Sequence, residues 1–219
     1  MSNQMNKIIL GFIASLFCWS GCHAADGINS ILWGLRGAVD YNFPSKWHFD
    51  GGSVNMHTPG YGFTLGGVCN VYLGKGFYLE PGVSFFYDTY KYDFVVVDPG
   101  FYMVTNKPGI NKLGLRVPVM AGYTFDISDA FSMCVYTGPE FSYSFSGKIK
   151  WSEDFEVYLS DNLFESEQRR ADAAWKVGIG FPYKSLMASI DIALGMTDIL
   201  KSDMRGYDRR FSVALTYYL

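Results

Sequence analysis

The feature that most constrains this chain is a strict alternation of large apolar residues with small or polar ones near its C-terminus. The large residues of this stretch are Phe211, Val213, Leu215, Tyr217 and Leu219. Successive side chains of a β-strand point to opposite faces, so a period of two with bulky residues on one face indicates a strand with one apolar side. The same pattern recurs seven more times along the chain. Those stretches are about 31–43, 60–73, 76–91, 111–126, 130–147, 172–183 and 186–198.

The segments between these eight stretches alternate in length. Tight turns are expected at Gly74-Lys75, Ile127–Asp129 and Lys184-Ser185. Longer connections are expected at 44–59, 92–110, 148–171 and 199–205. An even number of strands with short turns at one end and long loops at the other is typical of outer-membrane barrels. The sequence therefore predicts an all-β fold, an eight-stranded antiparallel up-and-down transmembrane β-barrel with short periplasmic turns and long extracellular loops.

Composition argues against membrane-spanning helices. Outside the N-terminus the chain has no run of about 18 to 20 apolar residues, the length that a spanning helix needs. Charged residues make up 18% of the sequence, below the roughly 25% of soluble domains.

The N-terminus has the pattern of a secretory signal. Lys7 supplies a positive charge, an apolar run from Ile8 to Trp19 follows, and small residues around Ala24 offer a cleavage site. We expect residues 1–24 to be a signal peptide and residues 25–219 to form the outer-membrane barrel domain. A lipoprotein signal modified at Cys22 is the alternative.

The mature chain is acidic. Removal of residues 1–24 takes away one lysine and no acid, which leaves 17 basic and 21 acidic residues. This balance argues against binding of nucleic acid, which normally needs a basic patch. Cys69 and Cys134 fall on different strands with opposite facing, so we expect no disulfide between them. The sequence shows no metal-ligand spacing of Cys and His, and we expect no metal and no cofactor.

Side-chain size decides which face of the strands points outward. The polar faces are rich in Gly, Ala, Ser and Thr and carry few charges, whereas a surface in water would carry many Lys and Glu. An eight-stranded barrel has an interior just wide enough for side chains to fill, which favours small inward residues. The bulky faces suit lipid. A soluble barrel with a buried apolar face is the alternative.

The inward face is expected to hold a polar network of charged residues. Its members are Arg36, Asp40, Glu80, Asp88, Arg116, Glu140, Lys176 and Asp191. Buried charges must be paired or wetted, and neighbouring strands favour the pairs Glu80–Arg116 and Glu140–Lys176. A plug that holds the barrel together is the preferred interpretation, and a path for protons or ions is the alternative.

The first long loop contains residue types used in metal binding and nucleophilic catalysis. They are His48, Asp50, Ser53 and His57. Their spacing matches no zinc signature, so the sequence favours a solvated loop over a hydrolase or metal site.

Several short motifs, in order along the chain, resemble the PorT-like outer-membrane β-barrel family of Gram-negative bacteria of the Bacteroides type. The motifs are Gly62–Gly67, Tyr78–Gly82, Arg116–Pro118, Gly138–Glu140 and Gly195–Ile199. The resemblance implies insertion by the barrel-assembly machinery, and some members of that family take part in protein secretion. It carries over no catalytic residue. The chain departs from the usual C-terminal aromatic residue by ending in Leu219.

Together these observations predict a non-enzymatic, porin-like protein of the outer membrane, reached after signal-peptide export. Outer-membrane lipids surround the barrel, and its outer loops meet a partner, a ligand or the surface layer. The resemblance adds an envelope or secretion protein as partner and a role in secretion or envelope maintenance. The alternatives are a small barrel enzyme acting on lipid or peptide at the outer rim, and a narrow channel.

Overall fold

The computed structural model describes residues 31–55, 57–92, 94–97, 103–106, 108–128, 131–150, 162–166, 168–201 and 204–219. The expected signal peptide, including Cys22, lies outside the described residues. Among the described residues, no helix has the length and apolar character needed to cross a membrane. Cys69 and Cys134 are both free thiols, as predicted.

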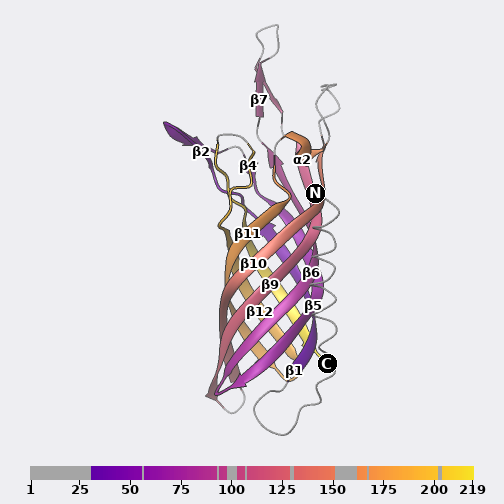
Figure 1. The fold of residues 1–219 in the computed structure, drawn as a ribbon, viewed down its shortest axis with the longest axis vertical. Coiled ribbons are helices and arrows are strands. Elements are labelled where there is room, and N and C mark those ends of the chain that lie inside the picture. The colour runs from indigo at the N-terminus through magenta and orange to yellow at the C-terminus, as the bar shows by residue number, and fades with distance from the viewer. Residues whose placement is uncertain are drawn as a thin grey trace, which may run out of the picture.

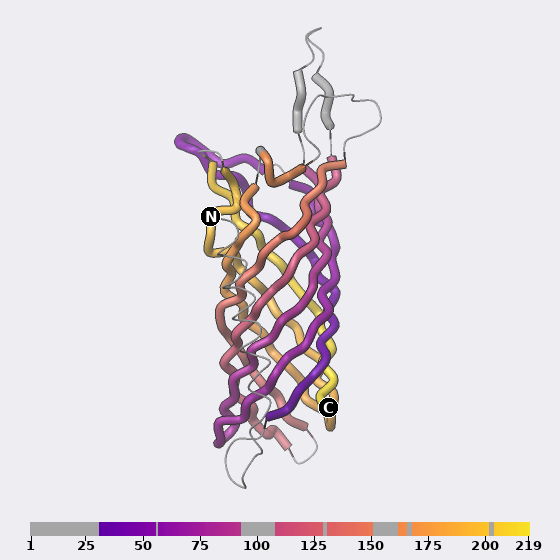
Figure 2. The backbone as a smooth tube through the Cα atoms, turned by 45° about the vertical axis from the view of Figure 1, so that its right-hand side comes forward, coloured from indigo at the N-terminus to yellow at the C-terminus, as the bar shows by residue number. Residues whose placement is uncertain are grey.

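Eight long antiparallel strands close into a barrel, which confirms the predicted fold (Figures 1 and 2). They are β1 (Ile31–Asn42), β5 (Gly60–Gly74), β6 (Phe77–Tyr92), β9 (Gly109–Ser128), β10 (Phe131–Lys150), β11 (Ala171–Tyr183), β12 (Leu186–Gly195) and β13 (Arg209–Tyr218). Each strand pairs with its neighbours along the chain, and β1 pairs with β13 from Gly34↔Tyr218 to Asn42↔Arg210. This last pairing joins the two ends of the sheet, so the barrel has no free edge along its wall.

The tight turns lie at one end of the barrel. At the first, Lys75 and Gly76 have φ values of 52° and 86°. Positive φ at both central residues is the geometry of a type I′ turn, whose twist matches that of the flanking strands. Lys184 likewise has φ 53° between β11 and β12. We call this the turn end, and the opposite end the loop end.

The loop end contains more regular structure than the sequence predicted. The segment expected as a loop at 44–59 contains β2 (Trp47–Phe49), β3 (Gly52–Val54) and β4 (His57–Thr58). A β7–β8 hairpin (Phe94–Val97 and Met103–Asn106) and the short helix α2 (Leu163–Ser166) also lie here, and Figure 1 shows them above the barrel. Two- to four-residue strands are too short to give a periodic signal, which is why the sequence did not reveal them.

The strand lengths differ around the barrel. β9 and β10 have 20 residues each, whereas a spanning strand needs about 9–11. Each is therefore about twice as long as a spanning strand requires. β12 ends at Gly195, three residues before the predicted end of that strand.

The outer face of the barrel is apolar. Leu35, Val39, Phe63, Leu65 and Phe85 are each 58–64% exposed. A continuous apolar surface around a whole barrel is far larger than the patches that soluble monomers expose. The predicted orientation is confirmed, and the soluble alternative, which buries this face, is excluded.

The interior is less uniformly small than predicted. At the turn end, large side chains (Tyr78, Met120, Cys134, Tyr136 and Met187) form a buried cluster, with Tyr218 packed against it. They fit because glycines stand opposite them. A Cβ added at Gly122 would lie 2.2 Å from the Tyr78 ring, and one at Gly178 would lie 2.4 Å from Tyr136.

A second buried cluster, which we call the outer cap, closes the loop end. Its members are Trp47, Tyr90, Tyr92, Ile110, Ile149, Leu163, Phe164, Ile199 and Leu200. Gln168, two residues after α2 and 1% exposed, hydrogen-bonds to the hydroxyls of Tyr90 and Tyr92. Its backbone N–H donates to the Leu163 carbonyl, so it connects α2 to β6. The interior therefore has an apolar layer at each end.

Candidate functional site

Between the two apolar layers lies a continuous network of buried ion pairs, which we call the lumen network. It joins four cations (Arg36, Arg116, Lys176 and Arg210) to five carboxylates (Asp40, Glu80, Asp88, Glu140 and Asp191). Each of these side chains is at most 10% exposed. They come from seven of the eight barrel strands, and β5 adds Thr64, whose hydroxyl donates to Asp40 over 2.6 Å.

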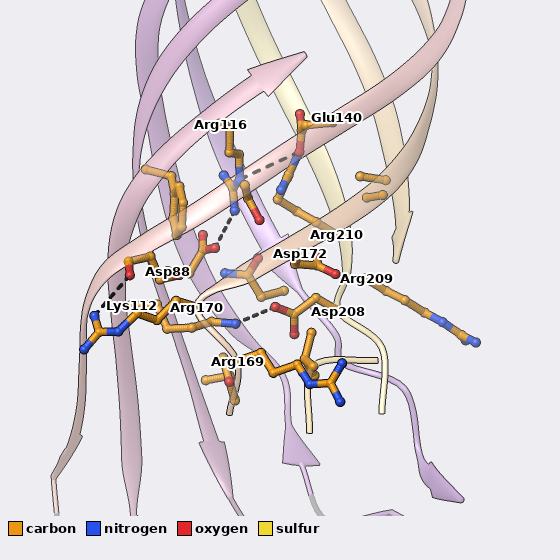
Figure 3. A pocket seen from close by; sticks show the side chains of 18 residues that line it. Asp88, Lys112, Arg116, Glu140, Arg169, Arg170, Asp172, Asp208, Arg209 and Arg210 are labelled. Atoms are coloured by element: carbon orange, nitrogen blue, oxygen red, sulfur yellow. Dashed lines mark hydrogen bonds and ion pairs between the residues drawn. The ribbon is translucent and has the colours of Figure 1, made fainter. Parts of the chain in front are cut away.

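Arg116 on β9 is the centre of the half of the network that is nearer the loop end. Its Nη1 lies 2.9 Å from Asp40 Oδ2 and its Nε lies 3.8 Å from Glu140 Oε1. Its Nη2 also contacts Asp88. The guanidinium carbon lies 4.1 Å from the centre of the Phe86 ring, which adds a cation–π contact. Figure 3 shows Arg116 held between Asp88 and Glu140.

Glu140 on β10 joins the two halves of the network. Arg210 Nη2 donates to Glu140 Oε1 over 2.6 Å, and Lys176 Nζ lies 3.6 Å from Oε2. Lys176 also lies 3.1 Å from Asp191 Oδ1. One carboxylate therefore faces cations from β9, β11 and β13.

Arg36 on β1 is the centre of the half of the network that is nearer the turn end. It donates to Asp191 Oδ2 over 2.8 Å and to the Tyr136 hydroxyl over 3.1 Å, and its Nη1 lies 3.4 Å from Glu80. The Tyr218 hydroxyl donates to the second oxygen of Glu80 over 2.6 Å. Tyrosine hydroxyls thus connect the ionic layer to the apolar layer at the turn end.

The structure brings together all eight residues of the expected polar network. The pair Glu140–Lys176 is confirmed. The predicted pair Glu80–Arg116 is wrong, because Glu80 meets Arg36, and Arg116 meets Asp40. Adjacent strands in a barrel are strongly staggered and tilted, so charges on neighbouring strands can lie at different heights.

Sequence reasoning missed Arg210, and also an ion pair between Lys112 and Asp208 above the network. The signal for both cations was present in the alternation. Arg210 shares the inward parity of Ser212, and Lys112 shares that of Arg116. Lys112 lies inside the strand predicted at 111–126, and Arg210 directly precedes Phe211, the first bulky residue of the C-terminal stretch.

The space left inside the barrel is small. The cavity above Arg116, lined by Asp88, Lys112 and Arg210 among others (Figure 3), has a volume of about 40 Å³. A second cavity, beside Arg36 and Lys176, has about 20 Å³. A buried water needs about 10–15 Å³ measured in this way, so each cavity has room for only one or a few waters.

The four residues of the first long loop do not form one site. His48 and Ser53 pair across the exposed β2–β3 hairpin, and Asp50 lies exposed at its turn. His57 is only 4% exposed, and its Nε2 accepts a hydrogen bond of 3.1 Å from the Trp47 indole. Within the described ranges, no group of three or more His, Cys, Asp or Glu side chains is arranged to hold a metal ion.

Residues 24–201 match a family model described as "Outer membrane protein beta-barrel domain". No curated protein matches the sequence.

Several solved structures are similar to this barrel. OprG from Pseudomonas aeruginosa is 10% identical, with a TM-score of 0.48, and the match covers 90% of this chain and 99% of that one. Neisserial surface protein A is 12% identical, with a TM-score of 0.42, over 85% and 96% of the two chains. Ail, the attachment invasion locus protein of Yersinia pestis, is 14% identical, with a TM-score of 0.40, over 88% and 100%.

Proposed function

This chain belongs to the family of outer membrane protein β-barrel domains, and from that premise we propose that it is a non-conducting, non-enzymatic scaffold. In this proposal the barrel anchors the protein in the outer membrane. The structured loop end is the interaction surface, which binds a partner protein, a ligand or the surface layer. Binding sites often lie on loops held by a rigid framework.

The observation that carries this proposal is the lumen network. Nine charged side chains from seven strands meet in the middle of the barrel, and apolar layers lie on both sides. Opening a path would separate buried ion pairs, and removing one partner of such a pair typically costs about 3–5 kcal/mol. The arrangement favours a rigid plug over a channel.

Planar-bilayer recording tests the closed lumen. We expect the folded protein to give no conductance steps under conditions in which a water-filled porin gives them. Regular single-channel steps that persist after repurification would overturn the proposal in favour of a channel.

The enzyme alternative is tested separately. The wild-type protein and a double variant, His48→Ala with Ser53→Ala, are incubated with phospholipid and peptide substrates. Both positions are exposed, so the fold should survive. We expect equal background hydrolysis for the two proteins, and hydrolysis by the wild type alone would support an enzyme.

Export and assembly complete the proposal. We propose that residues 1–24 are removed as a signal peptide and that the barrel-assembly machinery inserts the mature chain. The PorT-like resemblance supports a place in secretion or envelope maintenance, with another envelope protein as partner.

The intact mass of the protein extracted from outer membranes tests the cleavage of the signal peptide. A mature chain beginning at Ala25 supports cleavage, and a lipid adduct on Cys22 contradicts it. Crosslinking in intact cells tests for the partner.

A further inference from the structure

Outward-facing lysines gather on one side of the barrel, directly above its apolar belt. They are Lys91 on β6 and Lys148 and Lys150 on β10, all exposed. Register places them in two adjacent rows. Lys91 and Lys150 both pair with Gly109, and Lys148 pairs with Asn111, which also pairs with Thr89. We call these three residues the lysine patch.

The β-bulge in β10 creates two of the three positions of this patch. Before the bulge, even-numbered residues such as Ser144 face inward, and Phe145 is the extra residue. After it, Gly147 and Ile149 are buried, while Lys148 and Lys150 are exposed. Ile149 therefore enters the outer cap, and both lysines point away from the barrel.

The height of the patch matches the headgroup region of a membrane. In the two rows below it, the outward residues are Tyr87 and Leu113, then Phe85, Leu115 and Tyr143. Same-face rows are about 7 Å apart along a strand, and barrel strands tilt by about 40°. The lysines thus stand roughly 5–10 Å above the last apolar row, where lipid phosphates lie and where lysine side chains extend.

The patch also has the spacing and charge to hold an anion. Gly109, which has no side chain, separates Lys91 from Lys150, and the backbones of β6 and β10 are about 10 Å apart across it. No acidic residue occupies an outward position of β6, β9 or β10 in the two lysine rows. Beside the β10 edge, Asn162 forms an isolated bridge with Lys148, and its side chain donates a hydrogen bond to Glu165 on α2.

We propose that the lysine patch is a binding site for the phosphate group of a lipid headgroup in the outer leaflet. The acyl chains of that lipid lie against the apolar rows below, and the phosphate sits over Gly109 between the ammonium groups. The site would fix the depth and rotation of the barrel relative to the lipids on this side.

Native mass spectrometry of the full-length folded protein in nonionic detergent tests the proposal. The probes are phosphatidic acid, phosphatidylcholine and inorganic phosphate. We expect the wild type to prefer phosphatidic acid. A triple variant, Lys91→Gln, Lys148→Gln and Lys150→Gln, should bind it on the order of 100-fold more weakly, since each lysine near an anionic surface contributes about fivefold.

A matched control separates this patch from net charge. Lys46, Arg205 and Arg209 are also exposed at the loop end, and their triple change to Gln alters the net charge equally. This control should keep the wild-type affinity within about threefold, given one local site. Equal losses in the two triple variants, or no preference for phosphatidic acid over phosphatidylcholine, would overturn the site. Inorganic phosphate binding as tightly as phosphatidic acid would overturn the lipid assignment.

A second pair of variants tests whether the phosphate sits over Gly109. A Cβ added at Gly109 meets only the Lys150 Cβ, at 3.9 Å, so side chains are accommodated there. Gly109→Glu should place a carboxylate between the lysines and abolish binding, whereas Gly109→Gln should retain most of it. Equal affinities for the two variants would contradict the proposed position of the phosphate.

Discussion

At the scale of single residues, Glu140 is the carboxylate whose loss should disturb the interior most, because it faces three cations at once. Arg210, Lys176 and Arg116 approach it from three different strands, at 2.6, 3.6 and 3.8 Å. A carboxylate in this position offsets the repulsion between cations that are themselves nearly buried. Neutralising it leaves their charge uncompensated in a medium of low dielectric constant.

We therefore expect Glu140→Gln to lower the free energy of unfolding by about 3–5 kcal/mol. Urea unfolding of the protein folded in detergent micelles measures this change. Glu165→Gln is the control, since Glu165 is exposed on α2 and its loss should cost less than about 0.5 kcal/mol. Similar midpoints for the two variants would mean that the lumen network contributes little to stability.

Glycine positions show how tightly the interior is filled at the turn end. Gly122 lies against the Tyr78 ring, where an added Cβ would be 2.2 Å away. Gly67 on the outer face offers a comparison, since a Cβ there would meet only the Gly34 carbonyl oxygen, at 3.8 Å.

We expect Gly122→Ala to destabilise the barrel by about 1–3 kcal/mol, the usual cost of overpacking. Gly67→Ala should have a much smaller effect. The clash also predicts non-additivity: in a Tyr78→Ala background, Gly122→Ala should cost little. A double-mutant cycle from urea unfolding checks this, and additive costs would argue against direct contact.

At the scale of elements, the outer cap connects segments that are far apart in sequence. Trp47 belongs to β2, Tyr92 to β6 and Leu163 to α2, and Gln168 links α2 to β6 through hydrogen bonds with the two tyrosines. These loop-end elements therefore depend on one another, and a change in one should loosen the others while leaving the barrel wall closed.

We expect Gln168→Leu to increase amide hydrogen exchange in β2, β4 and α2, because the polar link to Tyr90 and Tyr92 is lost. Exchange in β12 and β13 should stay at the wild-type level, since their hydrogen bonds belong to the barrel wall. Exchange resolved by peptide gives the comparison. Faster exchange throughout the protein would show that the cap is needed for the stability of the whole barrel.

At the scale of the whole molecule, closure of the sheet by β1 and β13 is the decisive feature. Nine residue pairs join the two strands, from Gly34↔Tyr218 to Asn42↔Arg210. In a membrane, unpaired backbone groups cost several kcal/mol each, so a spanning sheet must close on itself. The last strand of the sequence is therefore as necessary as the first.

We expect the folded protein to migrate differently on a denaturing gel before and after boiling, because a closed barrel resists detergent unfolding. A variant that lacks residues 209–219 should migrate identically in both conditions, since it cannot close. Identical bands for the unheated and boiled full-length protein would contradict a stable barrel.

The alternation of side chains was sufficient to predict the eight strands, their order and the lipid-facing side. This is because period-two patterning is a local property that each strand carries in its own residues. It also placed Arg116, Glu140 and the other predicted network residues on the inward face. The short strands at 44–59 were not predicted, since two or three residues are too few to show a period. The β10 bulge was not predicted either, because it reverses the alternation after Phe145.

Which charged residues form ion pairs with one another was decided only by the tertiary structure. The sequence placed Glu80 and Arg116 on adjacent strands, yet strand tilt and stagger bring Glu80 to Arg36 and give Arg116 three other carboxylates. The large inward aromatics follow the same principle, since Tyr78 fits only where Gly122 stands opposite. Which face a side chain takes is determined by its place within one strand. Its neighbour across the lumen depends on how all eight strands are wound around a common axis.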